Sequence, residues 1–198
     1  MNIKLSHPYF PHPINLYDTP LERSLVLLIA DHFNIAANAV ENPNQPHHEE
    51  GYQQYAKRAK QAATNHKGMS YLYDEVLPYC DGSTVMPFLD GRMAIGTAGE
   101  TNWYIKEGLP VFAIFATREI TSAELRRFER DHRSGLFDVR PFTEEEKILI
   151  MANNPSLVVP HEETRLRTQI VYGGAKRPFE VSHLVRLPIP PGFYPNKK

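Results

Sequence analysis

Two short apolar runs flank a turn and a helix in the middle of the chain. The runs, Thr84 to Leu89 and Val111 to Phe115, contain β-branched and aromatic residues without polar interruption. This pattern is typical of parallel strands that are buried on both faces. Between them, Asp90 to Gly96 predicts a glycine-rich turn and Thr97 to Glu107 a helix. The stretch therefore predicts a βαβ unit whose turn lies at the carboxyl edge of the sheet, where open α/β sheets bind ligands.

The flanking segments continue the alternation of strand and helix patterns. Strands are predicted over 2–6, 39–41 and 136–142, the last of them parallel, and helices over 19–33, 52–64, 69–77, 122–132 and 144–152. This order predicts an α/β fold with an open, mainly parallel, flavodoxin-like or Rossmann-like sheet of about five strands flanked by helices. After residue 152 the pattern changes: 165–172 alternates like a strand, and the end is proline-rich. We expect 1–152 to form one domain and 153–198 to be an extension that packs on it or on a neighbouring subunit.

Composition and charge restrict the classes of partner. Among 198 residues, 22 Lys and Arg balance 23 Asp and Glu, and no long basic run occurs, which disfavours polymeric nucleic acid and anionic membranes as partners. No apolar stretch approaches the roughly 18 residues of a membrane span, and the amino terminus lacks the apolar region of a signal peptide. The single cysteine, Cys80, excludes an intramolecular disulfide and suits a reducing compartment. We expect a cytoplasmic protein.

Glu100 has two interpretations. With Thr97 it fits the S/T-x-x-E capping box, in which the threonine hydroxyl accepts a backbone N–H and the glutamate reaches back to the N-cap. Three other pairs share this spacing: Thr19 with Glu22, Thr121 with Glu124, and Thr143 with Glu146. The second interpretation is chemical, because Gly91, Gly96 and Gly99 remove side chains from the approach to the helix. Glycine lets the backbone come close to a ligand and adopt positive φ.

Further candidate site residues come from two loops. The proline-rich segment from His7 to Pro13 is expected at the carboxyl end of the first strand, where loops often carry function. It supplies His7 and Tyr9, whereas an ordinary loop position is the favoured interpretation of His12. The residues predicted to contact substrate are His7, Asp81, Phe88, Gly91, Arg92, Gly96 and Thr97. Asp81 is also explained by an Asp-Gly turn, and Arg92 either meets a phosphate or is an exposed loop residue.

Two adjacent histidines, His47 and His48, precede Glu49 and Glu50. Neighbouring positions do not face the same way on a helix, and no H-x-x-x-H or H-x-H spacing accompanies them. We therefore expect no metal site, and no motif for a cofactor is present.

The central unit also carries a resemblance to a known family. Its features are a tyrosine near the first strand, an acidic residue, a glycine four residues before a glutamate, and a G-x-P-V strand entry. These are Tyr9, Asp90, Gly96 with Glu100, and Gly108 to Val111. With them, residues 1 to about 116 resemble the nucleoside 2-deoxyribosyltransferases and the related nucleotide N-glycosidases. The second glycine of the family's G-x-G-x-E turn is replaced here by Ala98.

The resemblance implies that Glu100 attacks the anomeric carbon of a deoxyribosyl group, Asp90 helps the base to leave, and Tyr9 orients the glutamate. Cleavage of an N-glycosidic bond develops positive charge on the sugar and negative charge on the base, so a carboxylate and an acid suit the two sides. By analogy with glycoside hydrolysis, a retaining route needs the two carboxyl groups about 5 Å apart. The family's acid usually lies six residues before the glutamate, at Ala94 here, whereas Asp90 lies ten before it. Either the loop has gained four residues or Asp90 only makes a turn.

The main expectation is therefore cleavage or transfer at the N-glycosidic bond of a nucleoside, nucleotide or NAD-like small molecule. One alternative is a domain of the same fold that binds such a molecule without turning it over. Another is an interaction protein that acts through its tail and the charged helix over 122–132. The resemblance also implies a homo-oligomer, because family members often build their sites from two subunits. A dehydrogenase and a serine hydrolase are disfavoured, since G-x-G-x-x-G after the first strand and G-x-S-x-G are both absent.

Overall fold

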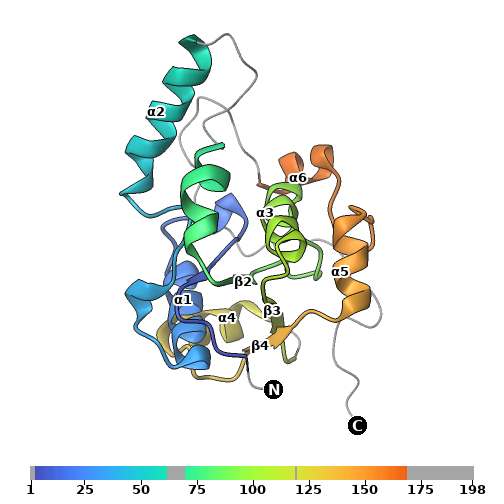
Figure 1. The fold of residues 1–198 in the computed structure, drawn as a ribbon. Helices are drawn as coiled ribbons and strands as arrows, with labels where there is room; N and C mark the ends of the chain where they lie inside the picture. Colours follow the sequence, from blue (N-terminus) through green and yellow to red (C-terminus); the bar gives the residue numbers. More distant parts are fainter. Residues whose placement is uncertain (1–2, 62–69, 119, 169–198) are drawn as a thin grey trace.

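The computed structural model describes residues 3–61, 70–118 and 120–168, which form an α/β fold around a four-stranded open sheet (Figure 1). The strands are β1 (Pro8–Tyr9), β2 (Gly82–Val85), β3 (Val111–Ala116) and β4 (Phe137–Pro141), in that spatial order. β1, β2 and β3 are parallel, and β4 is antiparallel to β3. The α/β prediction and the mainly parallel sheet are confirmed.

Two strand predictions are wrong in direction or extent. The strand predicted as the last parallel one is antiparallel, because the chain re-enters the sheet beside the end of β3 that it left, so that Phe137 pairs with Ala116. The strand predicted over 39–41 contributes one parallel bridge, between Glu41 and Tyr9, after the short helix η2 (Ala37–Ala39). Prolines at 43 and 46 follow, and proline cannot extend a ladder. In the described residues, the sheet has four strands in place of the expected five, and the segment over 39–41 adds only the bridge from Glu41 to Tyr9.

Helices cover both faces of this sheet. The longer ones are α1 (Pro20–Phe33), α2 (His48–Gln61), α3 (Ile95–Lys106), α4 (Ser122–Arg130), α5 (Glu144–Met151) and α6 (His161–Thr168), and the short ones are η1 (Ile14–Leu16), η2, η3 (Leu72–Val76) and η4 (Leu77–Tyr79). α1 and α4 pack together on one face, whereas α3 and α5 pack on the other (Figure 1). α2 projects from the body, at the upper left of the view. The strand predicted over 165–172 is wrong for 165–168, which belong to α6, and its remainder lies outside the described residues.

Strand β1 begins at Pro8, later than the predicted 2–6, so His7 precedes the strand instead of following it. Consecutive strand residues point to opposite faces of a sheet. Tyr9 accordingly belongs to the apolar cluster under α3, with Val85 and Tyr104, whereas the next residue, Phe10, belongs to the cluster under α1. Both aromatic side chains are completely buried. This alternation commits Tyr9 to the face of the sheet that carries α3.

Asp81 fastens the start of β1 to the start of β2. Its carboxylate accepts hydrogen bonds from the Ser6 N–H at 2.6 Å, the Ser6 hydroxyl at 2.7 Å and the His7 N–H at 3.1 Å. These contacts lie at the amino ends of the two strands, opposite to the edge where the α3 turn begins. Asp81 therefore holds the two strands together, and its contact with substrate stays a prediction.

No helix in the described ranges is both long enough and apolar enough to span a membrane.

We predict that Asp81→Ala lowers the free energy of unfolding by about 1–3 kcal/mol, because two backbone N–H groups lose their acceptor. Urea unfolding followed by circular dichroism measures the change. Asp74→Ala is the matched control, since Asp74 is exposed on η3 and its loss is expected to change stability by less than about 0.5 kcal/mol. Equal changes in the two variants would contradict the anchoring role.

Candidate functional site

Helix α3 begins at Ile95, earlier than predicted, and a distant segment completes its amino end. Its N-cap residue, Ala94, provides no side-chain cap. The Ile95 N–H instead donates to the hydroxyl oxygen of Thr164 at 3.2 Å. Just before the helix, the Met93 N–H donates to the Leu157 carbonyl at 2.7 Å, and the Met93 carbonyl accepts the Val159 N–H at 2.8 Å. Residues 157–164 thus bind to the body of the protein at the start of α3.

The capping-box prediction for Thr97 and Glu100 is wrong. Of the three parallel cases, Thr143 with Glu146 forms the full reciprocal box, and the other two form only its threonine half. In those three, the threonine hydroxyl accepts the glutamate N–H at the start of α1, α4 and α5: Thr19 with Glu22, Thr121 with Glu124, and Thr143 with Glu146. Thr97 lies inside the first turn of α3, where its carbonyl accepts the Thr101 hydroxyl at 2.8 Å. Glu100 lies in the second turn and has no capping function.

The Glu100 side chain is buried against Tyr9. Glu100 is 7% exposed, and its Oε2 accepts a long hydrogen bond of 3.4 Å from the Tyr9 hydroxyl. Burial raises the pKa of Glu100 to about 8, and the Tyr9 hydrogen bond opposes this rise. Because desolvation penalises the charged form, the carboxyl is mainly protonated at neutral pH. A carboxyl group that titrates near neutrality is a recurrent property of functional sites.

Four tyrosines from separate segments interact electrostatically with this carboxyl group. They are Tyr9 of β1, Tyr17 after η1, Tyr52 of α2 and Tyr73 of η3. Burial is the largest cause of a raised pKa in each of them, and the charge of Glu100 is the second cause. The pKa of Tyr73 rises to about 12, so its hydroxyl stays protonated and can donate a hydrogen bond. The surroundings of Glu100 therefore combine aromatic surface with hydroxyl donors.

The three glycines before Glu100 have different roles. Gly91 has a φ of 85°, and its N–H donates to the Phe88 carbonyl at 2.8 Å in a tight turn. A Cβ at Gly99 would approach the Tyr73 hydroxyl at 3.1 Å, so this glycine allows η3 to come close to α3. A Cβ at Gly96 would meet nothing within 4 Å. The first turn of α3 therefore borders open space at Gly96.

Asp90 and Arg92 pair with each other. The Asp90 side chain is buried, and its Oδ2 accepts the Nε and Nη2 of Arg92 at 3.1 and 2.9 Å. Arg92 Nη2 also donates to Glu163 at 3.0 Å, so two carboxylates neutralise the residue that was predicted to meet a phosphate. Within 3–61, 70–118 and 120–168, no hydrogen bond or ion pair joins Asp90 to Glu100. Arg92 thus connects Asp90 and the turn to α6.

Three other candidates lie apart from Glu100 in their described contacts. Phe88 is buried in the apolar cluster on the α1 face and lines a small apolar cavity there. His12 is also buried, with ring nitrogens 2.8 Å from the Phe10 carbonyl and 3.0 Å from Glu22. His7 is partly exposed, and its Nε2 lies 3.5 Å from Glu41 Oε2. Sequence reasoning instead missed Tyr17, Tyr52 and Tyr73, since no spacing distinguishes them among ten tyrosines.

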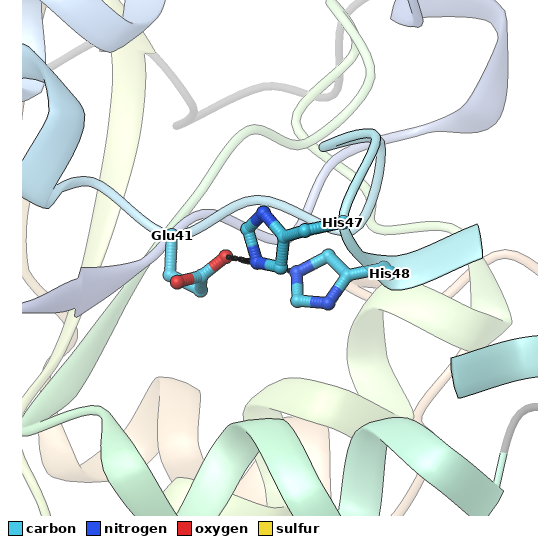
Figure 2. Close-up of side chains that lie close together, drawn as sticks. All are labelled: Glu41, His47 and His48. Carbon is cyan, nitrogen blue, oxygen red and sulfur yellow. Dashed lines mark hydrogen bonds and ion pairs between the residues drawn. The ribbon is translucent and has the colours of Figure 1, made fainter. Parts of the chain in front are cut away.

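A second polar cluster joins Glu41 to the adjacent histidines, and Figure 2 shows their side chains converging. Glu41 Oε1 lies 2.8 Å from His48 Nε2 and 3.3 Å from His47 Nε2. The expectation that adjacent histidines diverge is wrong, because His47 precedes α2, which begins at His48. Burial alone would raise the pKa of Glu41, but the His48 hydrogen bond and the nearby imidazoles bring it below its ordinary value. Glu41 is thus held as a carboxylate.

Comparisons of the chain with protein-family models, with curated proteins and with solved structures found no match. The likeness to the deoxyribosyltransferases consequently rests on the residues quoted above. Function is inferred from the geometry around Glu100.

We predict that Glu100→Gln stabilises the protein increasingly as the pH rises. The folded state keeps the Glu100 proton from its ordinary pKa of 4.5 up to about 8, so this group's contribution is complete at low pH and is lost as the pH rises through that window. The unmodified protein should lose about 1.4 kcal/mol per pH unit there relative to the neutral glutamine variant.

Urea unfolding at pH values between 5 and 9 tests this difference. Glu107→Gln, at the exposed carboxyl end of the same helix, is the control and should follow the unmodified protein. Parallel stability profiles for Glu100→Gln and the unmodified protein would show that Glu100 is ionised in the folded state throughout.

Proposed function

We propose that this protein cleaves or transfers the glycosyl group at the N-glycosidic bond of a nucleoside, nucleotide or NAD-like small molecule, with Glu100 as nucleophile. The observation that carries the proposal is the buried contact between the Glu100 carboxyl and the Tyr9 hydroxyl at 3.4 Å. α3 follows β2, so this contact lies near the carboxyl ends of parallel strands, the edge at which α/β sheets bind ligands. Helix capping does not explain the presence of Glu100, since the Ile95 N–H at the start of α3 donates to the Thr164 hydroxyl oxygen instead.

In the proposed reaction, one carboxylate oxygen of Glu100 attacks the anomeric carbon of the sugar. The bond from that carbon to the base nitrogen breaks, and its electron pair leaves with the base. Tyr9 holds the other carboxylate oxygen and thereby orients the attacking one. Water or a second base then displaces Glu100 from the glycosyl ester, giving hydrolysis or transfer respectively.

The departing base needs a hydrogen-bond donor, and tyrosine hydroxyls are available near Glu100. Burial and the charge of Glu100 raise the pKa of Tyr52 and Tyr73, so both hydroxyls remain protonated. Because the Tyr52 hydroxyl donates to the Pro43 carbonyl at 3.3 Å, Tyr73 is the donor proposed for the base. The rings of both tyrosines also supply aromatic surface, on which a planar base can stack. Asp90 keeps its ion pair with Arg92 in this scheme, so Tyr73 takes the role that the family resemblance assigned to Asp90.

A second candidate function is binding of a nucleotide-like molecule without turnover. The Asp90–Arg92 ion pair favours it, because the carboxyl expected to assist the leaving base is already engaged. The raised pKa of Glu100 also favours it, since a protonated carboxyl is a hydrogen-bond donor and not a nucleophile. The two candidates differ in one measurable property, the release of free base.

We predict that the unmodified protein releases free base from at least one member of a panel of nucleosides, nucleotides and NAD, and that Glu100→Gln reduces the rate at least about a thousandfold. Tyr9→Phe should reduce it about a hundredfold, because the attacking carboxylate loses its orientation. Chromatography of the reaction mixture measures the base, and Glu107→Gln is the matched control on α3. Thermal stabilisation by a nucleoside without any base release would instead support binding alone.

We also predict that kcat/KM rises with pH through a midpoint near pH 8 and then levels off, because only ionised Glu100 attacks and its pKa is about 8. The Tyr9 hydrogen bond lowers that pKa, so Tyr9→Phe should move the midpoint of the profile to higher pH. Initial rates between pH 5 and 10 give both profiles. A rate that is independent of pH across this range would exclude Glu100 as the titrating nucleophile.

A further inference from the structure

Glu41, His47 and His48 have the donor set and the convergence of a metal site. One ligand atom from each side chain lies within 4.8 Å of the other two. Figure 2 shows both imidazole rings beside the Glu41 carboxylate. Two imidazole nitrogens and one carboxylate are the protein ligands of many open zinc sites, in which water fills the fourth position. We propose that these three side chains bind one zinc-type divalent metal ion.

The backbone that carries these ligands is fixed before any metal binds. Glu41 is bonded to the edge of the sheet, since its N–H donates to the Pro8 carbonyl at 2.9 Å and its carbonyl accepts the Phe10 N–H at 2.7 Å. The loop to the histidines is short and contains two prolines, and the Gln45 side-chain amide donates to the Val40 carbonyl at 3.1 Å. Ligands on a constrained backbone lose little freedom when a metal binds, which favours affinity.

The hydrogen-bond partner of His48 Nδ1, the Tyr71 hydroxyl, suits metal binding by the other ring nitrogen. The His48 side chain is 3% exposed, and its Nδ1 lies 3.2 Å from the Tyr71 hydroxyl. An Nδ1–H that donates to this oxygen leaves the lone pair of Nε2 for the metal, the arrangement found around most metal-bound histidines. Tyr71 is itself positioned by α2, because its ring occupies the space beside Gly51, where a Cβ would lie 2.3 Å from the ring.

His47 gives the cluster access to solvent, and His7 helps to orient the Glu41 carboxylate. The His47 side chain is 61% exposed, so a metal ion can reach the cluster from solvent. His7 Nε2 lies 3.5 Å from Glu41 Oε2, the oxygen that does not contact the other two histidines. His7 thereby helps to hold Oε1 toward His47 and His48.

The proposed metal site is close to the Glu100 site but independent of its chemistry. Glu41 and Tyr9 form a parallel bridge, so their side chains lie on the same face of the sheet. The Tyr52 ring packs edge-on against His48, with 6.3 Å between the ring centroids, and burial and the charge of Glu100 are the largest causes of its raised pKa. Metal binding requires no property of Glu100, so either proposal can fail without the other.

Isothermal titration calorimetry with zinc chloride tests the proposal on the full chain, prepared without a polyhistidine tag and stripped with a chelator. We expect one zinc ion per chain, and the same stoichiometry and affinity in Glu100→Gln. Loss of an outer partner costs about 10–100-fold in metal affinity. Tyr71→Phe should therefore weaken binding about tenfold, and Glu41→Gln and His47→Ala at least about a hundredfold.

His132→Ala is the matched control, because His132 Nε2 also lies beside a carboxylate, 2.9 Å from Asp31, but outside the cluster. Its zinc affinity should equal that of the unmodified protein. His47 is exposed, so His47→Ala is expected to fold, and zinc should raise the melting temperature of the unmodified protein but not of this variant. Absence of stoichiometric binding, or unchanged affinity in both His47→Ala and Glu41→Gln, would overturn the proposal.

Discussion

The pairing of the two-residue strand β1 on both of its sides is the constraint on which both candidate sites depend. Tyr9 pairs with Ser83 of β2 on one side and with Glu41 on the other. Its backbone therefore fixes Glu41, while its side chain reaches Glu100 on α3. Because the strand is buried, its hydrogen bonds cannot be exchanged for bonds to water without a substantial penalty. Short as it is, β1 thus determines the relative positions of two carboxyl groups.

These two carboxyl groups are driven in opposite directions by their surroundings. Apolar and aromatic burial favours the protonated form of Glu100, whereas the imidazoles of His48, His47 and His7 favour the ionised form of Glu41. When the pKa values of two carboxyl groups differ in this way, one face of a protein can hold a protonated acid and an ionised base at the same pH. Glu41 therefore offers a permanent anionic ligand, and Glu100 a carboxyl whose charge is sensitive to solvent access and to whatever lies beside it.

Local patterns predicted the local features of this fold and missed those set by distant contacts. Three of the four expected threonine N-caps formed, because each depends on neighbouring residues only, and the one at Thr143 also has the return bond from its glutamate. The fourth did not, because the group that meets the Ile95 N–H lies 69 positions away, on Thr164. The central βαβ unit was likewise visible in its apolar runs, although β2 covers Gly82–Val85 and not the predicted Thr84 to Leu89. The direction of β4, in contrast, depends on where the chain re-enters the sheet beside Ala116.

The residues of the candidate sites also fall into those that the sequence predicted and those that depend on distant contacts. Tyr9 and Glu100 were named through a family resemblance, and the fold brings their side chains together. The tyrosines around them come from segments far apart in the sequence, and no spacing connects those segments. The Glu41 cluster was missed because helical geometry was assumed for both histidines, whereas His47 precedes the helix. Its convergence also requires the bridge to Tyr9, which a sequence pattern does not reveal.

The hydrogen bond from the Ile95 N–H to Thr164 has a consequence for folding during synthesis. The residues that form β1, β2, α3 and β3 leave the ribosome well before Thr164 does, since synthesis runs from the amino terminus. The sheet can therefore assemble while the first turn of α3 still lacks the Thr164 oxygen and the pairing of Met93 with Val158. The start of the helix that carries Glu100 can therefore be completed only after residues 157–164 have been synthesised. A nascent chain that stops at residue 152 would carry every strand of the sheet but lack the contacts that close the start of α3.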